Sequence, residues 1–405
     1  MTGKFAPSEW RFDGTYRAAE APDRSYFAAA NTSRGFVGWF EELISVGCTR
    51  RMIIKGGPGT GKSHMLYRMA DTASAAGAAV EYYFCSSDPE SLDGIAAIFP
   101  DGRVYGVQDG TAPHAAEASL PGARDELFDL GACWDSSRLR AARSRIEELG
   151  AEKSRAWGRA FSCLASAGGL RRAALALAAG LTDLERAERT AARMAGEARR
   201  SMNGNESENG ASEASPVRHV LRSPHRSLGM RGAVMLGGIY HGARDVYLMS
   251  DEPFPGAGIL FVTAVAAEVE RSGTSCRISP DPLLPELCAA VRIGDVVYTA
   301  DRKPRLGAGA VLHRVGLRRF GGSTGSARAE YLRLSALADS AVTAALAAMS
   351  DAARAHFALE EIYMNTMDFE RKEAAEREAA AEFFAEYLKN CGFCDKMGVL
   401  KNSCE

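Results

Sequence analysis

One short segment constrains this chain more than any other. Eight residues with the pattern Gly-x-x-x-x-Gly-Lys-Ser run from Gly56 to Ser63, one residue after the apolar run at 52–54. The apolar run predicts a short buried strand, and the residues from about 62 to 76 predict a helix that stops near Gly77. A glycine-rich turn between a strand and a helix binds phosphate, because its N–H groups converge and the helix adds its positive dipole end. The segment therefore predicts a phosphate-binding loop.

Each residue type in this loop has a role in binding a nucleoside triphosphate. Lys62 supplies a positive charge for the β and γ phosphates, and the Ser63 hydroxyl supplies a ligand for Mg²⁺. ATP and Mg²⁺ are therefore the expected cofactors. The residues expected to contact them are Gly57, Pro58, Gly59, Thr60, Gly61, Lys62, Ser63 and His64.

Hydrolysis requires a further acidic group that holds Mg²⁺ or orients the attacking water. Asp109 closes the apolar run 104–107, where a metal-binding Walker B aspartate is expected. Asp88 follows the run 80–84, the position of the carboxylate that polarises water in RecA-like ATPases. His114 lies in the loop after Asp109 and could transfer a proton or contact a phosphate. The alternative for each is an ordinary loop residue, since aspartates commonly cap turns.

The rest of the chain indicates the fold class. Strands alternating with helices predict an α/β protein with a doubly wound, parallel sheet of the P-loop NTPase type. The order of elements then repeats. Gly35 is matched by Gly229 and Tyr105 by Tyr298, at offsets of 194 (229 − 35) and 193 (298 − 105). We therefore expect a duplicated fold in which each half ends in a long helical arm.

The second half departs from the first at its own glycine-rich loop. Where the first half has Lys62 and Ser63, the second has Ile259 and Leu260. The phosphate charge and the metal hydroxyl are both lost, so this degenerate loop should not hold Mg-nucleotide. The alternative is a Walker B strand at 247–253 with a catalytic acid at Asp251 or Glu252. Transport-type ATPases carry such a strand, but the signature segment that accompanies it is missing between residues 64 and 246.

Composition predicts the domain boundaries. We expect two long helices in 136–200, with a break near Gly168-Gly169. The polar segment 201–216 cannot bury enough apolar surface to order itself and predicts a flexible linker. The predicted parts are a P-loop domain at 1–135, a helical arm at 136–200, the linker at 201–216, a degenerate P-loop-like domain at 217–325, a second helical arm at 326–390 and a cysteine-containing tail at 391–405.

The bulk composition indicates where the protein is located and which classes of partner it binds. The net charge is −2, which argues against a nucleic-acid partner. No apolar run reaches the roughly 18 residues of a membrane span, and residues 1–10 lack the layout of a signal peptide. The nine scattered cysteines fit free thiols in a reducing cytoplasm. Three cysteines in the tail (Cys391, Cys394 and Cys404) fall one short of the usual four zinc ligands, so a solvated tail is the preferred interpretation.

Several segments together resemble an uncharacterised bacterial family of tandem P-loop ATPases. The most distinctive is Asp-Gly-Thr-Ala-Pro-His at 109–114. The resemblance implies ATP binding and a duplicated fold but supplies no substrate. This chain departs from the family pattern by losing the second loop, and by having Phe84 where the family tends to have histidine. The matching segments are 26–27, 31–32, 35–36, 55–63, 85–88, 93–94, 109–114, 121–122, 130–135, 218–219, 359–363 and 367–369.

Three functions stay open from the sequence. The first is a Mg²⁺-dependent ATPase whose degenerate half regulates the intact site or completes it with an arginine such as Arg218 or Arg244. The second is a nucleotide or small-molecule kinase with an acceptor near Asp88 and His114. The third is a non-catalytic switch that binds nucleotide and reorders its helical arms for a protein partner.

Overall fold

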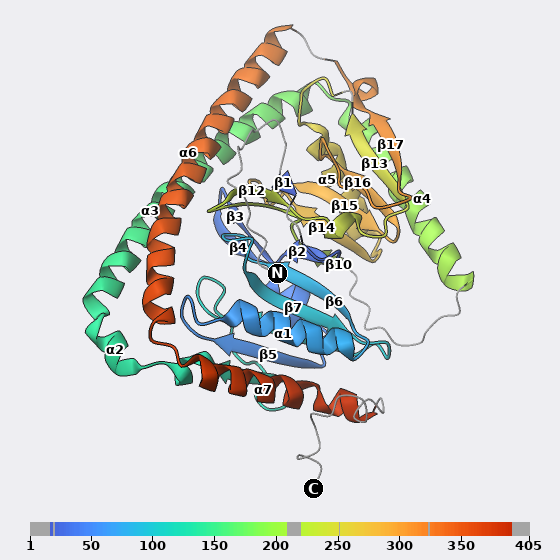
Figure 1. Ribbon diagram of the computed structural model, residues 1–405. Coiled ribbons are helices and arrows are strands. Elements are labelled where there is room, and N and C mark those ends of the chain that lie inside the picture. Colours follow the sequence, from blue (N-terminus) through green and yellow to red (C-terminus); the bar gives the residue numbers. More distant parts are fainter. Residues whose placement is uncertain (1–16, 19–20, 209–219, 251, 323–324, 391–405) are drawn as a thin grey trace. The chain divides into compact units, whose positions relative to one another are not determined.

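Figure 1 shows the computed structural model, which describes residues 17–18, 21–208, 220–250, 252–322 and 325–390. Arg218, Asp251 and the tail cysteines lie outside the described residues. The chain forms two compact units, each assembled from separate segments. The small unit comprises the described residues of Ile44–Glu81, Leu92–Gly150 and Ala355–Glu405. The large unit comprises those of Met1–Leu43, Tyr82–Ser91 and Ala151–Arg354.

Two six-stranded sheets share one strand order. The first runs β2 (Ser25–Phe27), β6 (Ala79–Phe84), β7 (Leu92–Ile98), β8 (Val104–Asp109), β5 (Arg50–Lys55) and β9 (Asp125–Asp129). The second runs β10 (Val220–Arg222), β14 (Cys276–Pro280), β15 (Cys288–Ile293), β16 (Val296–Thr299), β13 (Asp245–Ser250) and β17 (Val311–Gly316). Every strand of the first sheet therefore has a counterpart at the same place in the second. The expected duplication is confirmed, and β13 takes the place of β5, as the repeat offsets predict.

Both sheets are mixed, so the prediction of purely parallel sheets is wrong at one strand in each half. Strand β7 pairs antiparallel with β8, and β15 pairs antiparallel with both of its neighbours. The cause is the length of the connections. Residues 99–103 join β7 to β8, and only Gly294-Asp295 joins β15 to β16. Connections this short make hairpins, whereas parallel strands need a crossover of about a dozen residues or more.

Short strands and helical turns complete the connections. Strands β1 (Arg17–Ala18), β12 (Gly232–Met235) and β11 (Arg226–Gly229) form a three-stranded sheet, and β3 (Ala29–Thr32) pairs with β4 (Gly35–Gly38). The helical turns are η1 (Glu41–Ser45), η2 (Leu130–Cys133), η3 (Gly238–Tyr240) and η4 (Leu317–Phe320).

Equivalent helices follow the equivalent central strands. Helix α1 (Lys62–Ala75) follows β5, and α5 (Gly258–Arg271) follows β13. Helix α5 is much the more apolar, because Phe261 and Val265 are buried in one core cluster with Met194 of α4 (Leu184–Glu208). Helix α4 also continues to Glu208, so the first residues of the predicted linker 201–216 are helical. Each added residue of a formed helix gains a backbone hydrogen bond, which extends helices beyond what composition suggests.

The long helices α3 (Arg143–Gly180) and α6 (Gly325–Met364) pack together in antiparallel directions (Figure 1). In the large unit Arg159 pairs with Asp351 at 3.2 Å, and Arg171 donates to Ser335 at 3.3 Å. The partners therefore run in opposite chain directions. Small residues line the packed faces and let the helices approach closely: Ala160 and Ala167 on α3, Ala345 and Ala348 on α6.

The predicted helix break at Gly168-Gly169 is wrong, because α3 continues through both glycines. A Cβ on Gly168 would lie 2.3 Å from the Cβ of Ser33, so the glycine is required by close packing rather than by a turn. The break falls instead between α3 and α4, where the Asp183 carboxylate accepts the N–H of Arg186 at 3.0 Å. A capping aspartate of this kind begins a new helix.

Helix α6 is long and apolar enough to cross a membrane by length and composition alone, and a third of its most apolar window (33%) is buried against the protein. A buried core helix passes the same test, so this feature is a weak indication. In the structure, α6 uses its apolar face against α3.

The helix α7 (Phe369–Asn390) packs through aromatic rings on the part of the first sheet that lies in the small unit. Tyr105 of β8 stacks on Phe384 with ring centroids 5.8 Å apart, and Phe99 lies 3.8 Å from Tyr387. Aromatic pairs of this kind add to the free energy gained by apolar burial. They hold α7 against the sheet. The turn between α6 and α7 is thereby held beside the glycine-rich loop that connects β5 to α1.

Candidate functional site

The glycine-rich loop of residues 56–63 connects β5 to α1, as the sequence predicts. Gly59 and Gly61 have φ values of 68° and 84°, in the left-handed region that favours glycine. These two positions curl the backbone into the first turn of α1. The Thr60 side chain is buried, and its hydroxyl donates to the carbonyl of Gly57 at 2.9 Å. Glycine-rich backbone that curls in this way is typical of loops whose N–H groups converge on an anion.

Lys62 and Ser63 lie at the N-terminal end of α1. The Lys62 ammonium donates to the carbonyls of Gly56 and Gly57 at 3.1 and 2.7 Å, and lies 3.5 Å from the Asp109 carboxylate. The Ser63 hydroxyl accepts the backbone N–H of Leu92 at 2.9 Å. The first residue of β7 is thereby fastened beside the loop.

Three titratable side chains gather next to Lys62. The ligand atoms of Asp93, Asp109 and His114 all lie within 4.8 Å of one another. His114 Nε2 lies 3.4 Å from the Asp93 carboxylate, and His114 Nδ1 lies 3.1 Å from the carbonyl oxygen of Asp109. Thr111 ties this cluster to the loop, because its N–H donates to the Asp109 carboxylate at 2.8 Å and its hydroxyl donates to the Gly56 carbonyl at 2.9 Å.

The electrostatics of the cluster determine which of its groups are charged. Burial disfavours the imidazolium form of His114, but the carboxylates of Asp93 and Asp109 outweigh burial and raise its pKa to about 9. Burial also raises the pKa of Asp109, more than the positive charges of Lys62 and His114 lower it. At neutral pH His114 therefore carries a proton and is an acid or a fixed positive charge rather than a base.

The end of α6 and the start of α7 lie directly against the loop, which no sequence pattern predicted. A Cβ on Gly59 would lie 2.6 Å from the carbonyl oxygen of Glu360, and one on Gly61 would lie 2.7 Å from Lys372 Nζ. Gly57 faces the rings of Tyr363 and Trp134 in the same way. Gly59 is thus required on its outer side as well, because a Cβ there would collide with the main chain of α6.

A buried ion network joins α7 to α1 beside the loop. Glu376 is fully buried and lies 2.8 Å from Lys372 Nζ. The same carboxylate lies 3.2 Å from His64 Nδ1 and 3.7 Å from Arg68 Nε. His64, predicted as a nucleotide contact, is therefore engaged by Glu376, although its side chain is 57% exposed.

Asp88 belongs to the large unit, where its carboxylate accepts Arg231 Nε at 2.7 Å. Arg231 also pairs with Glu90 at 2.7 Å. The predicted water-orienting role of Asp88 stays a prediction. Arg244 pairs with Asp245 and Asp295 at 2.8 and 3.2 Å, also in the large unit, and its role as an arginine finger stays a prediction too.

The degenerate loop at 255–258 is contacted by a carboxylate side chain, that of Glu252. The Glu252 carboxylate accepts the N–H of Gly256, and the N–H groups of Gly258 and Ala257 also favour its charged form. Burial nevertheless raises the pKa of Glu252. A carboxylate from the preceding turn therefore lies against the N–H groups of this loop. This arrangement agrees with the loss of the lysine and serine from the second half.

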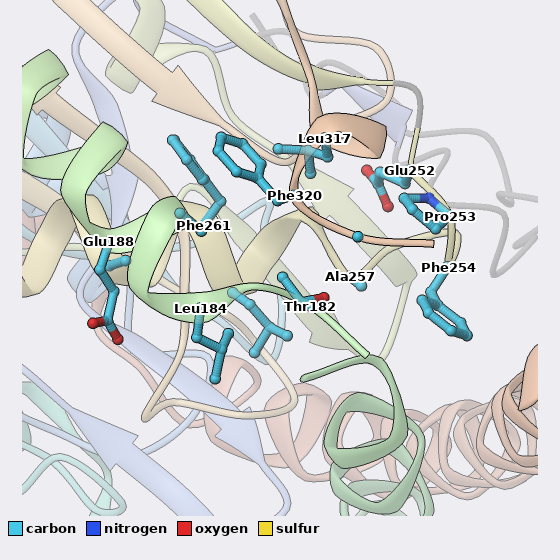
Figure 2. Close-up of a pocket in the computed structure, with 14 residues that line it drawn as sticks. Thr182, Leu184, Glu188, Glu252, Pro253, Phe254, Ala257, Phe261, Leu317 and Phe320 are labelled. Carbon is cyan, nitrogen blue, oxygen red and sulfur yellow. The ribbon is translucent and has the colours of Figure 1, made fainter. Parts of the chain in front are cut away.

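An apolar pocket opens beside the degenerate loop (Figure 2). Glu252, Pro253 and Phe254 line one part of it, and Leu184 and Glu188 of α4 line another. The remaining lining residues are Thr182, Ala187, Ala257, Leu260, Phe261, Ala264, Leu317, Phe320 and Gly321.

Sequence reasoning therefore found the loop, Asp109 and His114, and the structure brings them together in the small unit. It missed Asp93, Glu360 and Lys372 as parts of this arrangement. The sequence offered one signal for Asp93, its place in the segment 93–94, which is among the segments that carry the family resemblance. In comparisons with protein-family models, curated proteins and solved structures, nothing matched this chain.

Proposed function

We propose that the small unit binds a nucleoside triphosphate, ATP by preference, on the loop 56–63 and hydrolyses it with Mg²⁺. The observation that carries this proposal is the position of Lys62, whose ammonium lies between the loop carbonyls and the Asp109 carboxylate. A partly buried lysine beside a curled glycine loop and an acidic strand end is the arrangement used for phosphoryl transfer. The proposal places the reaction in the cytoplasm, as the sequence suggests.

The oxygen ligands near the loop fit a magnesium ion. Mg²⁺ prefers carboxylate and hydroxyl oxygens, and the site offers Ser63, Asp109 and Asp93. When bound, the ion would neutralise charge on the β and γ phosphates. His114 adds a nitrogen ligand that Mg²⁺ does not favour, so we assign it instead as a proton donor or a positive contact for phosphate.

The chain's own residues account for the steps around the phosphates. The N–H groups of the loop hold the phosphate oxygens, and Lys62 moves from the loop carbonyls onto the β and γ phosphates. The imidazolium of His114 stabilises charge that develops on the transferred phosphoryl group. Asp93 and Asp109 orient water at the same edge of the sheet. Transfer to an organic acceptor instead of water stays an open alternative, since no described residue favours one acceptor over another.

A second candidate, the nucleotide-gated switch, is favoured by one observation. The backbone of Glu360 and the side chain of Lys372 lie against the loop, so a ligand there would act on the helices α6 and α7. This role does not exclude hydrolysis.

The test is phosphate release from ATP with Mg²⁺, comparing wild type with Lys62→Ala. The proposal predicts turnover in wild type and a loss of at least about a hundredfold in the variant, since one fixed positive contact to the transition state contributes on that scale. Equal turnover in both proteins would exclude this loop as the hydrolytic site. Tight ATP binding without turnover in wild type would favour the switch.

A further inference from the structure

The ammonium of Lys372 lies inside the small unit, beside the last glycine of the loop 56–63. A Cβ on Gly61 would lie 2.7 Å from Lys372 Nζ, so the end of this side chain packs against the residue that precedes Lys62. The Lys372 side chain is only 4% exposed, and it belongs to the same unit as the loop. A second buried positive charge therefore lies next to the glycine-rich loop, in addition to that of Lys62.

The donors of this ammonium are not all used. Among the described residues, Lys372 Nζ has one ion pair, with Glu376 Oε1 at 2.8 Å, and no hydrogen bond. Glu376 Oε1 is itself buried without a hydrogen bond in this part of the chain. An ammonium has three N–H donors, and buried donors are normally satisfied because an unmet one costs free energy. Lys372 therefore has donors available for a further acceptor beside the loop.

We propose that Lys372 contacts the phosphates of a nucleotide bound on the loop 56–63, and that its ammonium leaves Glu376 to do so. This inference rests on the proposed function, because it adds a residue to the same site. A triphosphate carries more negative charge than one Mg²⁺ ion and one lysine neutralise, and a buried site must compensate the rest. The flexible four-carbon stem of lysine lets the ammonium move without a change in the helix.

The Glu376 carboxylate keeps a positive partner when Lys372 leaves. It lies 3.7 Å from Arg68 Nε and 3.2 Å from His64 Nδ1, both on α1. Arg68 Nε is buried and has no hydrogen bond within the described part of the chain, so it is available to this carboxylate. A guanidinium stays charged at any pH that the folded protein meets. The exchange therefore leaves no buried carboxylate unpaired.

The second half of the chain supports the assignment, because its equivalent helix has no lysine at this place. Helices α7 and α4 each begin after an aspartate, Asp368 and Asp183, whose carboxylate caps the first turn at 3.0 Å. Four positions after the cap stand Lys372 and Ala187, whose N–H groups donate to the carbonyls of these aspartates at 3.0 Å in both helices. Ala187 lines the pocket beside the degenerate loop. The half without an equivalent of Lys62 thus lacks this second lysine too.

The experiment is calorimetric titration of Mg-ATP into wild type, Glu376→Gln, the double variant Lys372→Met/Glu376→Gln, and the control Glu373→Gln. Methionine keeps an unbranched stem against Gly61 and removes the charge. The double variant leaves neither member of the buried ion pair without its partner. Glu373 is a glutamate on the same helix whose side chain is 51% exposed, so its variant reports the general loss of a negative charge.

The inference predicts a specific order of affinities. Glu376→Gln binds Mg-ATP more tightly than wild type, because Lys372 no longer has to leave a carboxylate. The double variant binds about tenfold or more weakly than Glu376→Gln, which is the scale of one hydrogen bond to a charged group. Glu373→Gln equals wild type. An ion pair that only supported the fold would instead give weaker binding when Glu376 loses its charge.

The outcomes separate this inference from the proposed function. A double variant that binds as tightly as Glu376→Gln overturns the contact of Lys372 with phosphate and leaves the nucleotide site standing. Binding by Glu376→Gln that is equal to or weaker than that of Glu373→Gln also overturns the inference, since Lys372 would then not be exchanged between the carboxylate and the phosphates. Absence of Mg-ATP binding in wild type and in every variant overturns both the inference and the proposed function.

Discussion

At the residue scale, the role of His114 is determined by the side chains around it, because a histidine can be a base, an acid or a fixed positive charge. His114 follows Asp109 in a loop, where most histidines are exposed. In the structure its side chain is 7% exposed and lies against Asp93, itself 7% exposed. Two carboxylates around one buried imidazole keep it protonated, which excludes the role of general base at neutral pH.

This arrangement predicts a pH dependence of stability. The folded-state pKa of His114 is raised from 6.5 to about 9, so its contribution is fully present below about pH 6.5 and is lost as the pH rises through about 9. The loss is on the order of 3 kcal/mol. Unfolding by urea between pH 6 and 10 should show wild type losing stability relative to His114→Gln across this window.

The matched control is His241→Gln, because His241 is 39% exposed and lies 3.7 Å from an exposed Asp23 carboxylate. This variant should keep the pH dependence of wild type. A His114→Gln variant with the same slope as wild type would contradict the assignment of the proton to His114.

At the scale of elements, the loop depends on glycine for two separate reasons. Gly59 has a positive φ, and its Cα also lies against the backbone of Glu360. Gly77, after the end of α1, has a φ of 88° but nothing within 4 Å of its added Cβ. An alanine at either position strains the backbone, but only an alanine at Gly59 also meets α6. The difference in stability between the two variants therefore measures the contact with α6.

The prediction concerns Gly59→Ala and Gly77→Ala. Each should lose about 1–2 kcal/mol of unfolding free energy, because alanine is strained in the left-handed region. Gly59→Ala should lose at least about 1 kcal/mol more, since its Cβ would collide with a main-chain oxygen that cannot rotate away. Chemical unfolding of both variants checks this, and equal losses would mean that α6 does not rest on the loop.

Local patterns predicted the loop and its flanking elements because their causes are local. The apolar residues before Gly56 and the helix formers after Gly61 suffice to specify β5 and α1. Strand β7 escaped prediction since Asp93-Gly94 is typical of a turn, whereas here Gly94 packs against Ile44. Because β7 was not predicted, Asp93 was not assigned to the site and the sheet was predicted to be purely parallel.

The contacts of Glu360 and Lys372 with the loop have no local cause. About 300 residues separate them from Gly59 and Gly61 along the chain, so only the path of α6 and the packing of α7 create them. The periodicity of α6 predicts an apolar face, but it cannot state what a charged residue near its end will meet. Contacts between residues so far apart in the chain are determined by tertiary packing, and local sequence patterns do not predict them.

At the scale of the whole molecule, the two sheets share one strand order but differ in the loop that follows the equivalent strands β5 and β13. The loop after β5 keeps its lysine and serine, and the loop after β13 has replaced them and is occupied by Glu252. We therefore propose a single site for nucleotide per chain, on the loop 56–63.

The most direct measurement is the number of Mg-ATP molecules bound per chain at saturation, by equilibrium dialysis, for wild type and Lys62→Ala. We expect one molecule per chain for wild type and none for the variant, because the degenerate loop lacks the lysine and is already contacted by the Glu252 carboxylate. Two molecules per chain for wild type, or one that survives in Lys62→Ala, would contradict it and would place a nucleotide site outside the loop 56–63.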